Sequence, residues 1–137
     1  MFLKQAVCIT ALLTSALAQF VYPYHDTLPE NGVLGRGYGL SSPSGAVTFG
    51  VTETGDLVLA ALGTTIWSYT GIDASFVKLE TDGNFIAYNA QLVPVWFTNT
   101  AGNLPPYIVS CQNDGNLVVY NGDSIPVWDT NTSGQVP

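Results

Sequence analysis

The residues of this chain best suited to chemistry gather in one short stretch, where polar and apolar side chains alternate. They are Gln112, Asp114, Asn116, Val118 and Tyr120, one at every second position. The two amides and the phenol each both donate and accept hydrogen bonds, while the carboxylate accepts them. The valine adds a small apolar surface. Such a set suits a neutral polyol, which has many hydroxyls and a small patch of C–H groups.

A β-hairpin would place these side chains on one surface. Asn113-Asp114-Gly115 is strong turn chemistry between two apolar runs. A two-residue loop would pair Gln112 with Leu117 and mix polar with apolar residues. A three-residue loop closed by a left-handed Gly115 pairs Gln112 with Asn116 instead. Because side chains alternate along a strand, this second register predicts an inner face of Val109, Cys111, Leu117 and Val119.

The same pattern occurs twice upstream, so the chain contains an internal repeat. The middle copy carries Glu80, Asp82, Asn84, Ile86 and Tyr88, and the first carries Thr52, Thr54, Asp56, Val58 and Ala60. A tryptophan follows each copy, 15 or 16 residues after its first polar position: Trp67, Trp96 and Trp128. Folding the copies alike predicts two further inner rows: Val77, Leu79, Phe85 and Ala87; and Phe49, Val51, Leu57 and Leu59.

The third copy resembles, position for position, the Q-x-D-x-N-x-V-x-Y motif of the bulb-type (monocot, snowdrop-like) mannose-binding lectins, the B-lectin domain family. The resemblance covers roughly Thr27 to Gly134. It implies an all-β fold, the β-prism II, with three four-stranded antiparallel sheets around a pseudo-threefold axis. We expect one such domain over 19–137, with repeats at about 27–71, 72–102 and 103–134. A β-trefoil also has threefold repeats, but they are longer and lack this hairpin motif.

The resemblance also implies roles for the motif residues. At the main site, Asp114 and Asn116 would address the axial O2 that distinguishes mannose, Gln112 would reach O3 and Tyr120 would reach O4. Val118 would contact the apolar patch. The middle copy would be a weaker second site, because Glu80 replaces glutamine. The first copy would be vestigial, because Thr52, Thr54, Asp56, Val58 and Ala60 lose both amides and the tyrosine hydroxyl.

The three tryptophans fit the structural core, since each holds the same position in its repeat; stacking on a sugar is the alternative. Family members usually carry a disulfide whose two positions correspond here to Gly55 and Ser75, so that bridge is absent. Cys111 falls on the inner face, and we expect a buried thiol. Covalent dimerisation through it is the alternative.

The first residues, 1–18, are typical of a secretory signal peptide, with Lys4, an apolar run and Ala16-Leu17-Ala18 at its end. We therefore expect a secreted, extracellular protein that begins near Gln19. Cys8 and Lys4 would be removed, leaving two basic residues against ten acidic ones, a net charge of −8. That balance argues against nucleic acid and anionic membranes as partners.

An enzyme is disfavoured by the residues present. A glycosidase needs two carboxylates across a cleft, whereas the acidic residues here lie mostly on turns of separate repeats. His25 is the sole histidine, and no ligand cluster for a metal or a cofactor is visible. A calcium-independent lectin for mannose-containing glycans is the expected function. The alternative is a secreted interaction or structural protein whose sugar sites have decayed.

The C-terminal end bears on assembly. In the family, exchange of this strand commonly builds a dimer, so the resemblance implies a homodimer joined through Val127 to Ser133. Asn131-Thr132-Ser133 is also an acceptor sequence for N-glycosylation. A glycan on Asn131 would crowd that exchange.

Overall fold

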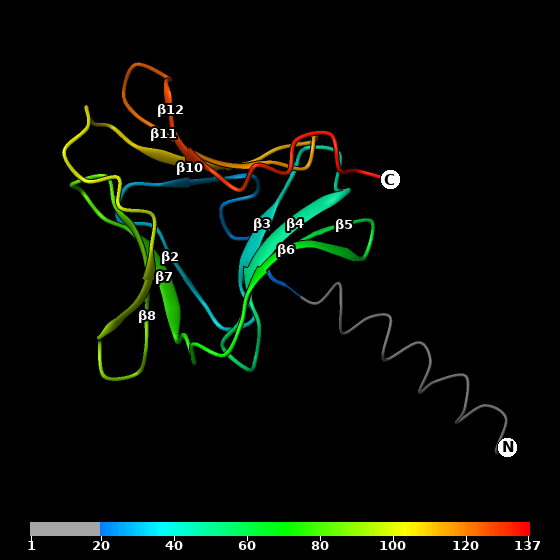
Figure 1. Ribbon diagram of the computed structural model, residues 1–137, viewed down its shortest axis with the longest axis horizontal. Coiled ribbons are helices and arrows are strands. Elements are labelled where there is room, and N and C mark those ends of the chain that lie inside the picture. Colours follow the sequence, from blue (N-terminus) through cyan, green and yellow to red (C-terminus); the bar gives the residue numbers. More distant parts are fainter. Residues whose placement is uncertain (1–19) are drawn as a thin grey trace, which may run out of the picture.

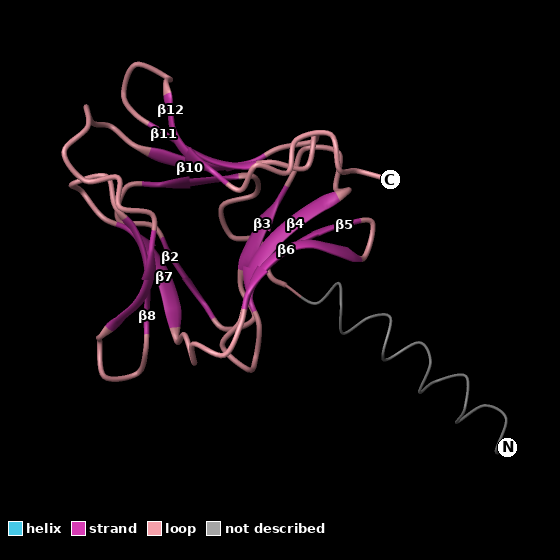
Figure 2. Ribbon diagram, viewed as in Figure 1, coloured by secondary structure: helices cyan, strands magenta, loops and turns pink. Residues whose placement is uncertain are grey.

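The computed structural model describes residues 20–137, so the predicted signal peptide lies outside the described residues. For residues 20–137, Figures 1 and 2 show strands and loops only. No helix long and apolar enough to cross a membrane occurs in this part of the chain. The strands are β1 (Thr27–Pro29), β2 (Val33–Gly35), β3 (Gly39–Ser41), β4 (Val47–Val51), β5 (Leu57–Ala61), β6 (Thr64–Tyr69), β7 (Phe76–Leu79), β8 (Phe85–Tyr88), β9 (Pro94–Phe97), β10 (Ile108–Cys111), β11 (Leu117–Tyr120) and β12 (Pro126–Asp129).

These strands form three four-stranded sheets, here numbered after the repeat that each contains. Sheet I has the order β3-β4-β5-β6, sheet II the order β2-β7-β8-β9, and sheet III the order β1-β10-β11-β12. All neighbouring strands are antiparallel. The sheets surround a common centre like the sides of a triangle (Figure 1). The predicted β-prism II fold is confirmed.

The segment from β1 to β3 holds the three repeats together. These strands follow one another in the sequence, yet β1 joins sheet III, β2 joins sheet II and β3 joins sheet I. Each lies at the edge of its sheet, beside the leading strand of a repeat hairpin. Each sheet is therefore one repeat plus one short strand from the N-terminal segment.

The predicted hairpin register is confirmed in all three repeats. The backbone N–H of Gln112 donates to the backbone carbonyl of Asn116 at 2.9 Å, and the backbone N–H of Gly115 donates to the backbone carbonyl of Gln112 at 3.0 Å. The turn glycines Gly55, Gly83 and Gly115 have φ angles of 81°, 100° and 97°. These values lie in the left-handed region that glycine adopts without steric cost. The three-residue loop is therefore the common turn of the fold.

The core is built from the three predicted inner rows, all of whose members have no exposed surface. At the axis, the half-buried rings of Trp67, Trp96 and Trp128 pack edge to face on one another. Their centroids are 5.6 to 6.2 Å apart. This spacing and tilt are favourable for aromatic pairs, so the rings contact one another rather than standing open as separate platforms.

Cys111 is a free thiol within this core, as expected. It has no exposed surface, and its sulfur lies 3.5 Å from the Val47 carbonyl oxygen, to which the thiol donates. Burial, which disfavours the thiolate, raises the pKa of Cys111 to about 12. The residue behaves as a small apolar side chain.

The turn that lacks the family disulfide is held by hydrogen bonds instead. The Ala74 N–H donates to the Gly55 carbonyl at 3.0 Å. The Arg36 guanidinium donates to the carbonyls of Ala74 and Glu53, at 2.8 and 3.2 Å, and to the Asp73 carboxylate at 2.6 Å. Arg36 therefore joins the first hairpin to the segment that leads into sheet II.

Candidate functional site

Each repeat places its motif on the outer face of its sheet, opposite the core. In the third repeat, Gln112, Asp114 and Asn116 border the turn, while Val118 and Tyr120 lie on β11. Because β11 alternates, these two side chains face away from the fully buried Leu117 and Val119. The hairpin thus brings all five predicted residues of the main site together.

The polar groups of this third site are linked to one another. The Gln112 side-chain amide donates to the Tyr120 hydroxyl oxygen at 2.5 Å, so the phenol keeps its own proton for another acceptor. One carboxylate oxygen of Asp114 accepts from the Asn116 backbone N–H at 3.0 Å. The other accepts from the Ser133 hydroxyl at 2.8 Å.

Asn116 is anchored more firmly than the sequence suggests, with only 7% of its surface exposed. Its side-chain oxygen accepts from the Thr130 hydroxyl at 3.1 Å and from the Thr132 N–H at 3.2 Å. Its side-chain nitrogen donates to the Asp129 carboxylate at 3.0 Å. Asp129 and Ser133 are therefore site residues that the motif did not reveal; their one sequence signal is their place just after Trp128.

The second site uses its polar groups differently. The Tyr88 hydroxyl donates to Glu80 Oε1 at 3.2 Å, so this phenol has no proton left for a ligand. The Lys78 ammonium lies 3.5 Å from the same oxygen, and the two side chains form an ion pair. Burial raises the pKa of Tyr88, and the charge of Glu80 and its hydrogen bond raise it further.

The asparagine of this second site is more open than its counterpart. Asn84 Oδ1 accepts a hydrogen bond from the backbone N–H of Asn99 at 2.8 Å, much as the Asn116 side-chain oxygen accepts from the backbone of Thr132. Its side-chain nitrogen, however, has no protein acceptor within residues 20–137. Asp82 uses one carboxylate oxygen for the Asn84 N–H at 2.9 Å, and no side chain of the described residues bonds the other. A ligand can therefore reach both groups.

The first site is occupied by its own side chains. The Thr52 and Thr54 hydroxyls lie 3.1 Å apart, and Thr54 donates to Asp56 at 3.2 Å. The Gly71 N–H donates to the other carboxylate oxygen of Asp56 at 3.0 Å. With Ala60 in the tyrosine position, few polar groups remain for a sugar.

No protein-family model and no curated protein sequence matches this chain, whereas solved structures do. The Japanese Marasmius oreades lectin is 50% identical over 86% of this chain and 99% of its own, with a TM-score of 0.83. The mannose-specific snowdrop (Galanthus nivalis) agglutinin, solved with methyl-α-D-mannoside, is 32% identical over 78% and 96%, with a TM-score of 0.65.

The chain belongs to the bulb-type lectin family. A further relative, from Gastrodia elata, is 28% identical over 79% of this chain and 98% of its own, with a TM-score of 0.72. It is described as a monomeric monocot mannose-binding lectin. This protein is therefore a carbohydrate-binding lectin.

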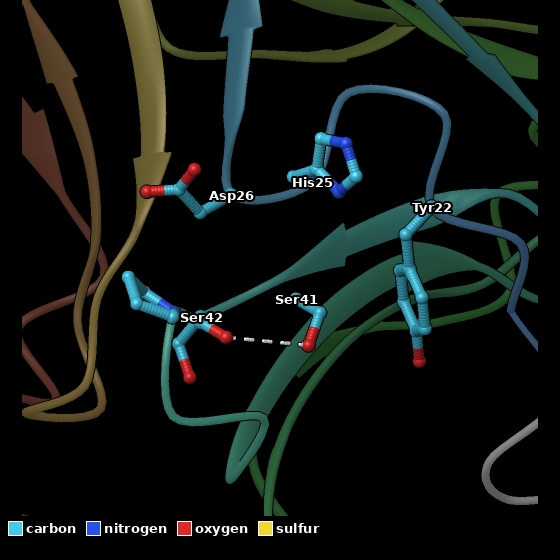
Figure 3. A pocket seen from close by; sticks show the side chains of 6 residues that line it. Tyr22, His25, Asp26, Ser41 and Ser42 are labelled. Atoms are coloured by element: carbon cyan, nitrogen blue, oxygen red, sulfur yellow. Dashed lines mark hydrogen bonds between the residues drawn. The ribbon is translucent and has the colours of Figure 1, made fainter.

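The lectin also has a cavity away from the motif faces, of about 310 Å³. Figure 3 shows its lining: Tyr22, His25, Asp26, Ser41, Ser42 and Pro43. These residues come from the segment before β1, from the end of β3 and from the two positions after it, and none belongs to a repeat motif. Within residues 20–137 no group of three His, Cys, Asp or Glu side chains could hold a metal ion.

Proposed function

We propose that this lectin is a secreted protein that binds terminal mannose or mannose-rich glycans at its third site, without calcium and without converting them. The observation that carries the proposal is the linked set of Gln112, Asp114, Asn116 and Tyr120. It presents donors and acceptors on one face of a rigid hairpin, as recognition of a neutral sugar requires. Val118, expected to contact the apolar patch of the sugar, is only 2% exposed, so the polar groups carry the site.

The relatives support the same ligand. The snowdrop agglutinin was solved with methyl-α-D-mannoside, and the Gastrodia lectin is described as mannose-binding. All five motif residues of the third site match the Q-x-D-x-N-x-V-x-Y pattern of the family. The rival proposal, an interaction protein with decayed sites, is favoured by the first repeat alone, where Thr52, Thr54 and Asp56 bond one another.

Replacing Asp114 tests the proposal. Asp114 is exposed on a turn, so Asp114→Ala should leave the fold intact while removing mannose binding at the third site. We expect a Kd of about 1 mM for a shallow site that holds one sugar, which corresponds to about −4 kcal/mol. Titration with methyl α-mannoside, with and without EDTA, measures the loss and the independence from metal.

Asp123→Ala, which removes an equally exposed carboxylate from the β11–β12 turn outside the motif, is the matched control and should bind like the wild type. Retained third-site binding by Asp114→Ala with an unchanged melting curve would refute the assignment. A wild-type protein that binds no mannose-containing glycan would favour the decayed scaffold instead.

A further inference from the structure

The outer face of sheet II differs from the other two at equivalent positions. One row of side chains crosses each outer face at the level of the motif valine or isoleucine. In sheet II this row is Val33, Lys78, Ile86 and Phe97; in sheet III it is Thr27, Ser110, Val118 and Asp129; in sheet I it is Gly39, Gly50, Val58 and Ser68. Sheet II alone carries an aromatic residue there.

Phe97 lies beside the second site. It is directly opposite Ile86 in the β8–β9 ladder, and such neighbours have Cβ atoms about 5 Å apart. Trp96 points inward, so Phe97 points outward, with 53% of its surface exposed. A ligand resting on Ile86 therefore has the Phe97 ring at its flank.

The same place on sheet III is closed to an apolar group. There the Asp129 carboxylate accepts a hydrogen bond from Asn116 at 3.0 Å. Val118, the counterpart of Ile86, is only 2% exposed. At the second site Ile86 is partly exposed, and Asn84 has a free side-chain nitrogen among the described residues.

The apolar character extends beyond Phe97. Phe76 and Tyr88, paired across β7 and β8, stack with ring centroids 5.2 Å apart. Val33, at the opposite edge of the sheet, is 43% exposed. Single exposed apolar residues are ordinary, and Lys78 separates Val33 from Ile86, so the apolar surface at the edge of this polar site is that of Phe97 beside Ile86.

We propose that Phe97, beside Ile86, forms an apolar subsite that takes the second sugar ring of an oligosaccharide whose terminal mannose rests on Ile86 in the second site. The proposal rests on the proposed mannose specificity and on a further assumption, that Asp82 and Asn84 of the second site hold the terminal sugar. The C–H face of a pyranose packs on the exposed ring, as apolar groups do on aromatic surfaces in ligand sites. The second and third sites then differ in preference, the second for longer glycans.

The experiment isolates the second site with Asp114→Ala. Titration calorimetry compares methyl α-mannoside, an α-linked dimannoside and 4-nitrophenyl α-mannoside on this background and with Phe97→Ala added. The dimannoside should bind several-fold more tightly than the methyl glycoside. Phe97→Ala should weaken the dimannoside about 3- to 10-fold, the size of one favourable aromatic contact. Affinity for the methyl glycoside should not change.

A matched control separates this effect from general loss of surface hydrophobicity. Ile125 is 54% exposed, close to the value for Phe97, but lies just before β12 on sheet III. Ile125→Ala should leave all three affinities on the Asp114→Ala background unchanged.

Each contrary outcome is distinct. If Phe97→Ala lowers the affinities for methyl mannoside and dimannoside equally, the oligosaccharide subsite is overturned. It is also overturned if Phe97 raises the affinity for the aryl glycoside alone. If Asp114→Ala abolishes all binding, the second site holds no sugar; the subsite falls, while the proposed function of the third site stands. If Phe97→Ala changes only the sedimentation coefficient, Phe97 belongs to a contact between copies and the subsite is likewise overturned.

Discussion

At the scale of single residues, the two fuller sites differ in the direction of one hydrogen bond. At the third site the Gln112 amide donates to Tyr120, and the phenol keeps its proton. At the second site Tyr88 donates its proton to Glu80. The change from amide to carboxylate therefore removes two donors from the sugar, one from residue 80 itself and one from its tyrosine.

Glu80→Gln should strengthen mannose binding at the second site. The substitution restores an amide donor and releases the Tyr88 proton. The ion pair with Lys78 is lost; its side chains are 32% and 24% exposed, and a pair near the surface is worth about 0–1 kcal/mol. The expected gain is about 1 kcal/mol, the net value of one hydrogen bond. Calorimetry on the Asp114→Ala background measures it.

The mirror-image substitution is the control for this prediction. Gln112→Glu, with the second site silenced by Asp82→Ala, should weaken the third site by a similar amount. An affinity that Glu80→Gln leaves unchanged or lowers would indicate that Glu80 serves a different sugar.

The buried thiol gives a prediction in pH. The pKa of Cys111 is about 12 in the folded protein, against an ordinary value near 9. As pH rises, the unfolded chain therefore loses the thiol proton before the folded protein does. The contribution of Cys111 to the free energy of unfolding is fully present below pH 9 and declines as pH rises toward 12. The free energy of unfolding should fall by up to about 1.4 kcal/mol per pH unit in that range.

Urea unfolding at pH 8 and pH 9.5 measures the decline, and Cys111→Ala should reduce it. The native thiol should also resist alkylation at pH 8, where the unfolded protein reacts readily. Rapid labelling of the folded protein would contradict a buried Cys111.

At the scale of elements, Arg36 joins two segments that no disulfide connects. Its guanidinium donates to two backbone carbonyls and to Asp73, across the first hairpin and the segment before β7. Gly55 leaves room for this arrangement, because a Cβ at its position would lie 2.9 Å from the Arg36 guanidinium. Backbone acceptors, rather than the exposed Asp73, anchor the side chain.

Arg36→Ala should lower the free energy of unfolding by roughly 2 kcal/mol, the scale of a hydrogen bond from a charged group. Asp73→Asn is the matched control. Its carboxylate is 83% exposed, so removing that charge should change stability by less than about 1 kcal/mol. Denaturant titration of both variants tests the ranking; equal losses would show that the ion pair, not the carbonyl contacts, stabilises this junction.

At the scale of the whole molecule, the motifs lie on different outer faces of a three-sided prism (Figure 1). The second and third sites therefore face in different directions, and as proposed sugar sites they would bind separate branches of a glycan surface. Linkage of weak sites raises the overall affinity by roughly 10² to 10⁴ when they engage together. A homodimer, which we propose from the family resemblance, would double the number of sites.

The proposed strand exchange can be trapped at β12. In the single copy described here, Val118 on β11 pairs with Asp129 on β12 of the same chain. Val118→Cys combined with Asp129→Cys should therefore form a covalent dimer on oxidation if β12 is exchanged, and a cross-linked monomer if it is not. Non-reducing electrophoresis and sedimentation distinguish the two results.

Glycosylation at Asn131 is the matching test. Asn131 is exposed, two residues from the Ser133 that bonds Asp114, so a glycan there would crowd both β12 and the third site. Asn131→Gln should restore exchange if glycosylated material is monomeric. A glycosylated protein that still forms the exchanged dimer would disprove the expected conflict.

Local chemistry explains how much of this lectin could be predicted from its sequence. The hairpin register follows from Gly55, Gly83 and Gly115, because glycine adopts the left-handed turn position readily, and from strict alternation on both strands. The same alternation predicts the inner rows and the position of Cys111. Gln112 and Tyr120 could be assigned to one face for the same reason.

Only the tertiary structure decided the remaining features, because they depend on segments far apart in the sequence. Strands β1, β2 and β3 have three residues each, too few for a periodic pattern to show that they join three different sheets. Asp129 and Ser133 reach the third site across 13 and 19 residues, respectively. Phe97 becomes the neighbour of Ile86 only when β9 pairs with β8. No local propensity encodes such contacts; they exist once the sheets have assembled around a shared core.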